Sequence, residues 1–318
     1  MEIMMNKRIE WVDVAKAIGI LLVVYGHVIL GVHDAGVWGN TFSYRLQHSV
    51  IYATHMPLFF FLSGIFAVKW VQRVAKTAIW QKAKTLLIPY FVWGIVQAVV
   101  MQVFSKSTNN GQGLGNAVQL PFMPYAQFWF LYDLFWIFMV YYLFLHVFKL
   151  STKWYIGFAA VMFLISPFMG VWEFWRIFYY MIFFALGTLV LNHSDLLDKV
   201  NIWLNLILVV ILHLIYFFVS MPTALHNAFS FFVAMSGVVL LINLSKHIKG
   251  SAIDYVGRNS MAIFLLHIIF TAGTRIVFTK LGLDNLYIQL IAGLFMGMLA
   301  PLVVLEITRK MKINQYLF

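Results

Sequence analysis

The sequence predicts an all-α, polytopic integral membrane protein, and its composition and hydropathy pattern carry that prediction. Hydrophobic residues make up 63% of the 318 residues and charged residues 10%, with a mean hydropathy of +0.87. Soluble domains average roughly 45–50% apolar and about 25% charged residues. The apolar residues also gather into runs of about 20, the length that an α-helix needs to cross a bilayer.

Ten such runs follow one another along the chain. The predicted spans are Val14–Val32, Ser49–Trp70, Thr85–Phe104, Gln127–Phe148, Trp154–Val171, Phe174–Leu191, Ile202–Val219, Leu225–Leu244, Asn259–Thr279 and Leu286–Thr308. The two longer connections, Asp34–His48 and Ser105–Ala126, are too short to fold separately. We therefore expect one transmembrane domain over residues 1–318. The first run is long and carries Lys16, so it reads as a retained span and not as a signal peptide.

Loop charge predicts the orientation. With a cytoplasmic N-terminus, sixteen of the twenty-two lysines and arginines fall on the cytoplasmic side, and Lys16 lies inside the first span. The opposite side receives Arg45, Lys106, Arg176, Arg275 and Lys280. By the positive-inside rule, both termini should be cytoplasmic, in agreement with an even number of spans.

The net charge of +11 is spread between the apolar runs and is not clustered in an arm or a patch. This distribution suits contact with a lipid bilayer and argues against a nucleic-acid partner. The chain has no cysteine, which excludes disulfides and thiolate chemistry.

Two ionisable residues, Lys16 and His27, stand eleven residues apart in the first span. At about 100° per residue this spacing ends about 20° past three turns, so both side chains share one helix face. At about 1.5 Å per residue they lie roughly 16 Å apart. One face of this helix is therefore expected to carry a cation at one depth and a proton-transferring imidazole at another.

The predicted topology groups other buried polar residues with His27 in an outer layer. His55, Asp133, Arg176 and Arg275 fall at similar depth, and His267 lies closer to the middle. Charges in hydrocarbon cost at least about 2.5 kcal/mol each, so they normally face a shared interior. A neutral histidine can accept a proton from a hydroxyl, and a carboxylate can fix its tautomer, which makes His27, Asp133 and His55 catalytic candidates.

Structural alternatives remain open for two of these residues. Asp133 can instead pair with Arg176 or Arg275. His55 can hydrogen-bond the backbone that Pro57 leaves unpaired.

The inner layer is strongly basic. Its lysines and arginines can neutralise the phosphates of a nucleotide-like cofactor, or face anionic lipid headgroups. The candidates are Lys16, Arg73, Lys76, Lys82, Lys84 and Arg258. Lys16 can also reach the nearby interface or pair with Asp13 three residues earlier.

Five sequence blocks resemble, in order, the membrane acyltransferase 3 family, especially its fucose 4-O-acetylase-like branch. The blocks are the Lys16-x10-His27 pair preceded by Arg8–Asp13, His55–Gly64 (HMPLFFFLSG), Leu87–Tyr90 (LIPY), Phe128–Leu131 (FWFL), and Val256–Met261 (VGRNSM) followed by His267. The resemblance spans almost the whole chain.

The resemblance implies an O-acyltransferase of the bacterial cytoplasmic membrane. Its donor would be a cytosolic acyl-CoA, usually acetyl-CoA, with no metal, and its acceptor a hydroxyl of a surface polysaccharide or lipid-linked glycan. The inner layer would hold the diphosphate, and His27 would act as general base or through an acyl-histidine. Trp129, Tyr132 and Arg275 are candidate oxyanion donors, and together with Arg176 and Arg45 they form the expected substrate side. The expected assembly is a polysaccharide synthase complex or a homo-oligomer.

The chain also departs from the family pattern. Lys16 stands where many relatives have arginine, and an Arg-x-x-Arg of some relatives corresponds here to Arg73-Val-Ala-Lys76. We expect no appended hydrolase-like domain. Two other functions remain open: a glycan exporter with buried aromatic residues lining its path, and a non-catalytic partner in a synthase complex.

Overall fold

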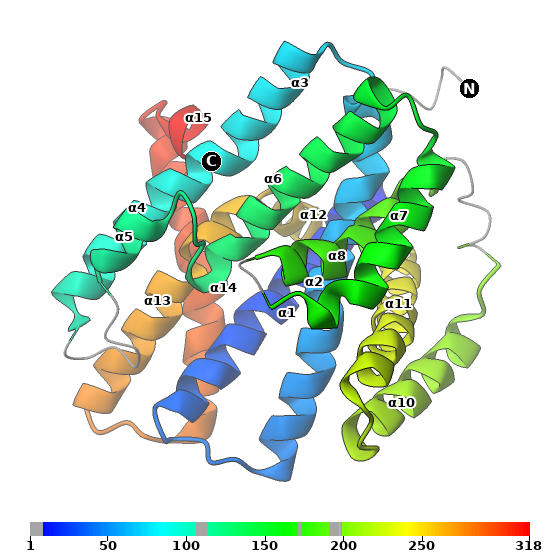
Figure 1. Ribbon diagram of the computed structural model, residues 1–318. Helices are drawn as coiled ribbons and strands as arrows, with labels where there is room; N and C mark the ends of the chain where they lie inside the picture. Colours follow the sequence, from blue (N-terminus) through cyan, green and yellow to red (C-terminus); the bar gives the residue numbers. More distant parts are fainter. Residues whose placement is uncertain (1–8, 106–112, 171–172, 191–196, 198) are drawn as a thin grey trace.

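The computed structural model is all-helical over the residues it describes, which are 9–105, 113–170, 173–190, 197 and 199–318, and these residues contain no strand (Figure 1). Its helices, including short 3-10 and π segments labelled η, are α1 Glu10–Asp34, α2 Phe42–Trp70, α3 Ala75–Lys82, η2 Ala83–Leu87, α4 Ile88–Val103, α5 Gly115–Gln119, η4 Ala126–Phe128, α6 Trp129–Tyr142, η5 Leu143–Val147, α7 Thr152–Ile165, η6 Ser166–Phe168, α8 Phe174–Gly187, α10 Ile202–Phe218, α11 Thr223–His247, α12 Ser251–Arg258, α13 Ser260–Lys280, α14 Leu286–Lys310 and α15 Asn314–Leu317.

Among the described residues, seven helical segments are long and apolar enough to cross a membrane. They are α1, α2, the continuous run Ala75–Val103, the run Ala126–Val147, α11, α13 and α14. The other three predicted spans appear as shorter apolar helices over Thr152–Phe168, Phe174–Gly187 and Ile202–Phe218. The helical membrane fold is thus confirmed, whereas the count of ten spans stays a prediction.

Helix α2 begins earlier than the hydropathy pattern predicts. The expected connection Asp34–His48 ends at Thr41, whose hydroxyl accepts a hydrogen bond of 3.2 Å from the Tyr44 backbone amide. This side-chain cap satisfies a backbone donor that the first helical turn leaves unpaired. The first turns of α2 are polar, and hydropathy detects only the apolar part of a helix, so the predicted span begins later than the helix does.

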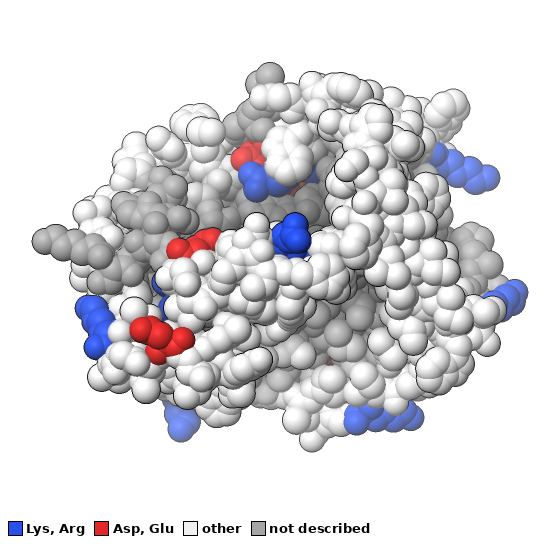
Figure 2. All heavy atoms as spheres, turned by 90° about the horizontal axis from the view of Figure 1, so that it is seen from below, with Lys and Arg blue, Asp and Glu red and all other residues white. Residues whose placement is uncertain are grey.

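Helix α1 runs through the middle of the helix bundle. It packs against α2, α11, α12, α13 and α14, and its Ile20, Val24 and Ile29 are fully buried. We call the end of the bundle where α1 joins α2 the outer end, and the end where α2 joins α3 the inner end. Figure 2 views the outer end, where single or small groups of charged side chains are separated by uncharged surface. The assignment of this end to the outside of the cell stays a prediction.

Helices α2 and α8 meet at two glycines. A Cβ atom built on Gly64 would lie 2.0 Å from the Phe184 carbonyl oxygen, and one built on Gly187 would lie 2.0 Å from that of Phe61. The two backbones therefore touch directly, as small residues allow between membrane helices. This contact fixes α8 against the helix that carries His55.

Replacing Gly64 or Gly187 by alanine should destabilise the protein. Each added methyl group overlaps a backbone carbonyl, and overpacking of this kind costs about 1–3 kcal/mol. Thermal unfolding followed by intrinsic fluorescence in detergent should show a lower midpoint for Gly64→Ala and Gly187→Ala. Gly157→Ala is the matched control, because a Cβ there meets no atom within 4 Å. Equal midpoints for the three variants would contradict the proposed contact.

Candidate active site

A cavity of about 360 Å³ at the inner end brings together three of the predicted basic residues. Lys16 of α1, Lys82 of α3 and Arg258 of α12 all line it, together with the first residue of α13, Ser260. Helix α12 approaches α1 at Gly257, where a Cβ atom would lie 1.8 Å from the Asp13 carbonyl oxygen. This close approach is what places Arg258 at the same cavity as Lys16.

The three cations have defined neighbours. The Lys16 ammonium lies 3.9 Å from the Asp13 carboxylate and 5.4 Å from the centre of the Phe66 ring. Lys82, which is partly buried, places its ammonium 3.5 Å from the centre of the Phe138 ring. Aromatic faces attract cations, so Phe138 stabilises this charge away from bulk water. Arg258 donates from Nε to the Asp254 carbonyl oxygen at 3.1 Å, within its own helix.

The other three predicted cofactor residues do not line this cavity. Arg73, Lys76 and Lys84 are exposed at the inner end. Arg73 contributes its backbone carbonyl to a hydrogen bond of 3.2 Å from the Tyr142 hydroxyl. Their exposure fits the alternative reading of charges that face headgroups.

Sequence reasoning missed four polar residues that line the inner cavity. They are Ser63, Gln81, Thr85 and Ser260. Gln81 and Thr85 flank Lys82 on the continuous helix Ala75–Val103, four residues apart and therefore on one face. The four-residue spacing of Gln81 and Thr85 could have predicted this shared face. However, the predicted span begins at Thr85, whereas the helix begins at Ala75.

Three histidines from three helices converge beyond the inner cavity. The rings of His27 on α1 and His267 on α13 lie 5.0 Å apart between centroids. Tyr52 of α2 lies 6.4 Å from His27 and 5.1 Å from His55. The structure therefore brings His27, His55 and His267 to one site. Of these, His267 had been placed near mid-depth without a catalytic role.

Backbone hydrogen bonds set the tautomers of two of these histidines. The Nδ1 of His55 donates to the Ile51 carbonyl oxygen at 2.6 Å, and that of His267 donates to the Phe264 carbonyl oxygen at 2.7 Å. A carbonyl can only accept, so the proton sits on Nδ1 and each Nε2 keeps a lone pair. His55 thus bonds the carbonyl four residues earlier in its own helix, and not the Ala53 carbonyl that Pro57 leaves without a donor.

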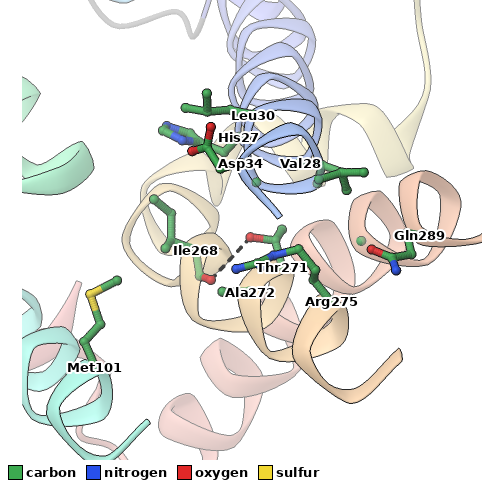
Figure 3. Close-up of a pocket in the computed structure, with 13 residues that line it drawn as sticks. His27, Val28, Leu30, Asp34, Met101, Ile268, Thr271, Ala272, Arg275 and Gln289 are labelled. Carbon is green, nitrogen blue, oxygen red and sulfur yellow. Dashed lines mark hydrogen bonds between the residues drawn. The ribbon is translucent and has the colours of Figure 1, made fainter. Parts of the chain in front are cut away.

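A smaller cavity of about 130 Å³ adjoins His27 on the outer side (Figure 3). Besides His27, its polar lining includes Asp34, Arg275 and Gln289. In Figure 3 the Arg275 side chain extends from α13 toward the end of α1. Of the predicted substrate-side residues, Arg275 is the one that shares this cavity with His27.

Phe264 connects the lining of the inner cavity with the histidines. Phe130 and Phe264 both line the inner cavity, and their ring centroids are 5.4 Å apart. The Phe264 ring lies 6.1 Å from the His267 ring, which itself contacts His27. The Phe264 side chain therefore lies between the inner cavity and the His267 ring.

Asp133 pairs with an arginine and not with His27. Its fully buried carboxylate lies 3.9 Å from Arg176 Nε, and Arg176 also pairs with Glu173. The Arg176 guanidinium lies 4.9 Å from the centre of the Trp129 ring. Asp133 is therefore paired with Arg176, which was the structural alternative to a role beside His27, and this ion pair joins α6 to α8.

The remaining predicted substrate residues lie elsewhere. Tyr132 follows Trp129 on α6, and its hydroxyl donates to the Pro121 carbonyl oxygen at 3.4 Å. Arg45 is exposed in the first turns of α2. Within the described ranges, no group of three histidine or acidic side chains is arranged to hold a metal ion.

Comparison with known proteins identifies relatives of the chain. Residues 9–306 match the family model of acyltransferase 3, described as an acyltransferase domain. A segment of 166 residues is 29% identical to the nodulation protein NolL of Sinorhizobium fredii. The segment covers 51% of this chain and 43% of NolL, so the chain spans less than half of that relative. No solved structure matches the chain.

Removing the Arg176 charge should destabilise the fold strongly. Arg176→Gln leaves the Asp133 carboxylate buried without a countercharge, and breaking a buried pair in this way costs about 3–5 kcal/mol. The thermal unfolding midpoint should fall well below that of Arg45→Gln, which removes an exposed arginine from the same end.

A double variant separates the pairing from a general loss of packing. Adding Asp133→Asn to Arg176→Gln removes the uncompensated charge, so part of the lost stability should return. A double variant that melts lower than both single variants would refute the ion pair as the source of the stability.

Proposed function

The chain belongs to the acyltransferase 3 family, and from this premise we propose that it is a membrane O-acyltransferase that uses acetyl-CoA. The acceptor is a hydroxyl of a surface polysaccharide or of a lipid-linked glycan. The observation that carries this proposal is that Lys16 and His27, at the two ends of one stretch of α1, each border a cavity with further polar side chains in its lining.

The inner cavity suits the phosphates of acyl-CoA. Lys16, Lys82 and Arg258 supply three positive charges, and cationic side chains are the common protein partners of phosphate. Ser260 places the N-terminus of the 21-residue helix α13 at the same cavity, where the helix dipole also favours an anion. The apolar lining, including Phe59 and Leu62, suits the aliphatic part of the donor.

His27 performs the proton transfer in this proposal. It accepts the proton of the acceptor hydroxyl as the hydroxyl oxygen attacks the thioester carbonyl, and it returns that proton to the sulfur when the C–S bond breaks. The products are the glycan ester and the free thiol of CoA. His55 and His267 each donate the Nδ1 proton to a backbone carbonyl oxygen. Each ring therefore presents an unprotonated Nε2 and adds no charge to the site.

Arg275 is the oxyanion donor that the geometry favours. It lines the cavity beside His27, whereas Trp129 belongs to the ion-paired cluster of Asp133 and Arg176 and the Tyr132 hydroxyl bonds Pro121. A fixed positive charge stabilises the negative oxygen that develops during attack on a thioester. Asp133 takes no part in the proton transfer here and positions α6 against α8.

The proposed setting is the cytoplasmic membrane of a bacterium, with both termini in the cytoplasm. This orientation puts the inner cavity on the side where acyl-CoA is made, and the His27 cavity on the side where surface glycans are assembled. Residues 1–318 then act as one acyltransferase domain. The proposed assemblies are a polysaccharide synthase complex and a homo-oligomer of this chain.

Substitution of His27 should abolish transfer. Loss of a general base lowers a rate by roughly 100- to 10,000-fold. Purified His27→Gln protein, supplied with radiolabelled acetyl-CoA and a panel of polysaccharides and lipid-linked glycans, should incorporate correspondingly less label than wild type. The control is His247→Gln, an exposed histidine at the inner end of α11. Undiminished labelling by His27→Gln would exclude this mechanism.

Substitutions in the inner cavity should weaken donor binding. A hydrogen bond to a charged group contributes about 1.5–3 kcal/mol, so Lys16→Ala, Lys82→Ala and Arg258→Ala should each raise the Kd for CoA by roughly 10- to 100-fold. Isothermal titration calorimetry provides the measurement. Lys76→Ala and Lys84→Ala, which remove exposed charges outside the cavity, are the controls, and His27→Ala should weaken binding less than Lys16→Ala. Equal losses in all these variants would contradict the site.

A further inference from the structure

A third cavity opens at the outer end, on the opposite side of α2 from α1. It measures about 510 Å³ and is formed by α2, α8, α10, α11 and the turn at η6. Ligand pockets commonly have volumes of roughly 300–1,000 Å³. The cavity beside His27, at about 130 Å³, lies below that range. The His27 cavity therefore has room for a reacting group, and a larger acceptor needs a second place to bind.

The lining of the third cavity combines aromatic rings with polar groups that carry no fixed charge. Its aromatic side chains are Tyr52, Trp175, Tyr179, Tyr180 and Tyr216. Its polar side chains are His48, Ser49, Thr223, His226, Asn227 and Ser230. Among the residues that the structure describes there, none is lysine, arginine, aspartate or glutamate. This chemistry suits a neutral ligand with both apolar faces and hydroxyl groups.

Hydrogen bonds and ring stacking hold this lining in place. The hydroxyls of Tyr179 and Ser230 lie 2.8 Å apart, and Asn227 donates from Nδ2 to the Phe163 carbonyl oxygen at 3.0 Å. The Tyr216 ring stacks on His226 with centroids 4.5 Å apart. Side chains fixed before a ligand arrives lose little entropy on binding, which favours affinity.

Tyr52 connects the third cavity with the histidines. Its ring lines the cavity, stacks on His48 at 4.1 Å between centroids, and meets His27 edge-on at 6.4 Å. Its hydroxyl lies 3.5 Å from the Gly26 carbonyl oxygen, next to His27 in α1. A ligand in the third cavity is therefore one aromatic side chain away from the proposed base.

We propose that the third cavity binds neutral sugar units of the acceptor glycan that adjoin the unit being acylated. This inference rests on the proposed function. Pyranose rings present C–H faces that pack on aromatic rings, and their hydroxyls pair with amide, imidazole and hydroxyl groups. A lining without lysine or arginine disfavours phosphorylated or carboxylated sugars, because a buried anion needs a countercharge. The acceptor is accordingly an oligosaccharide of at least two units, and not a single sugar.

Membrane anchoring is the competing explanation for these aromatic residues, because tryptophan and tyrosine gather at bilayer interfaces. Trp175 is 45% exposed, and this exposure is compatible both with membrane anchoring and with ligand binding. Anchoring predicts that removal of Trp175 or Tyr216 lowers stability and leaves glycan binding unchanged. The two roles therefore differ in a measurable way.

The test uses full-length protein in lipid nanodiscs, since glycoside detergents would compete for a sugar site. The probes are an array of neutral oligosaccharides of two to four hexose units, their single-hexose components, and counterparts that contain uronic acids. We expect wild type to bind at least one neutral oligosaccharide more tightly than its single hexose or its acidic counterpart. Trp175→Ala and Tyr216→Ala should weaken that binding by roughly tenfold, the effect of truncating an aromatic anchor.

Trp203→Ala is the matched control, because Trp203 lies on the same helix as Tyr216 and is 71% exposed. It should leave glycan binding unchanged, and all variants should retain CoA binding as a sign of a native fold. Absence of binding to any neutral oligosaccharide, or equal binding by wild type and Trp175→Ala, would overturn the proposal. Radiolabel transfer from acetyl-CoA that continues despite that result would leave the proposed function standing. Glycan binding without transfer would instead overturn the proposed function and leave the third cavity as a sugar site without a role in acylation.

Discussion

The structure depends on one constraint: α1 carries a lysine and a histidine through the middle of an apolar bundle, so other helices must enclose both. Helices α2, α11, α12, α13 and α14 surround it. Glycines allow this close packing, since a Cβ on Gly257 or Gly297 would collide with atoms of α1. The same packing leaves a cavity beside each of the two residues, with further polar side chains in its lining.

Much of the fold was predictable because bilayer thickness imposes a length on apolar helices. Each of the ten predicted runs corresponds to a helix, although only seven of these segments are long enough by themselves. The eleven-residue spacing of Lys16 and His27 predicted their shared face, since it depends only on helix geometry. In the structure both residues lie near α13, which supplies Phe264 to one cavity and His267 to the other site.

The partners of these residues were less predictable, because they depend on how helices pack. Asp133 could reach His27 or an arginine at equal depth, and only the α6–α8 contact assigns it to Arg176. Lys82 and Lys84 are two residues apart, yet helical rotation turns one into the inner cavity and leaves the other exposed. The third cavity collects residues from five elements, α2, η6, α8, α10 and α11, and no local pattern marks them as a set.

The contact between Phe130 and Phe264 has a consequence for a protein that spans a membrane. The cavities that border Lys16 and His27 approach each other along α1, with the Phe264 side chain between the inner cavity and the histidines. Two close-packed phenyl rings offer no hydrogen-bonding chain along which protons or ions could move. Under the proposed function, donor and acceptor meet beside these rings, so the same two side chains that lie near the reaction would also separate the two sides of the bilayer.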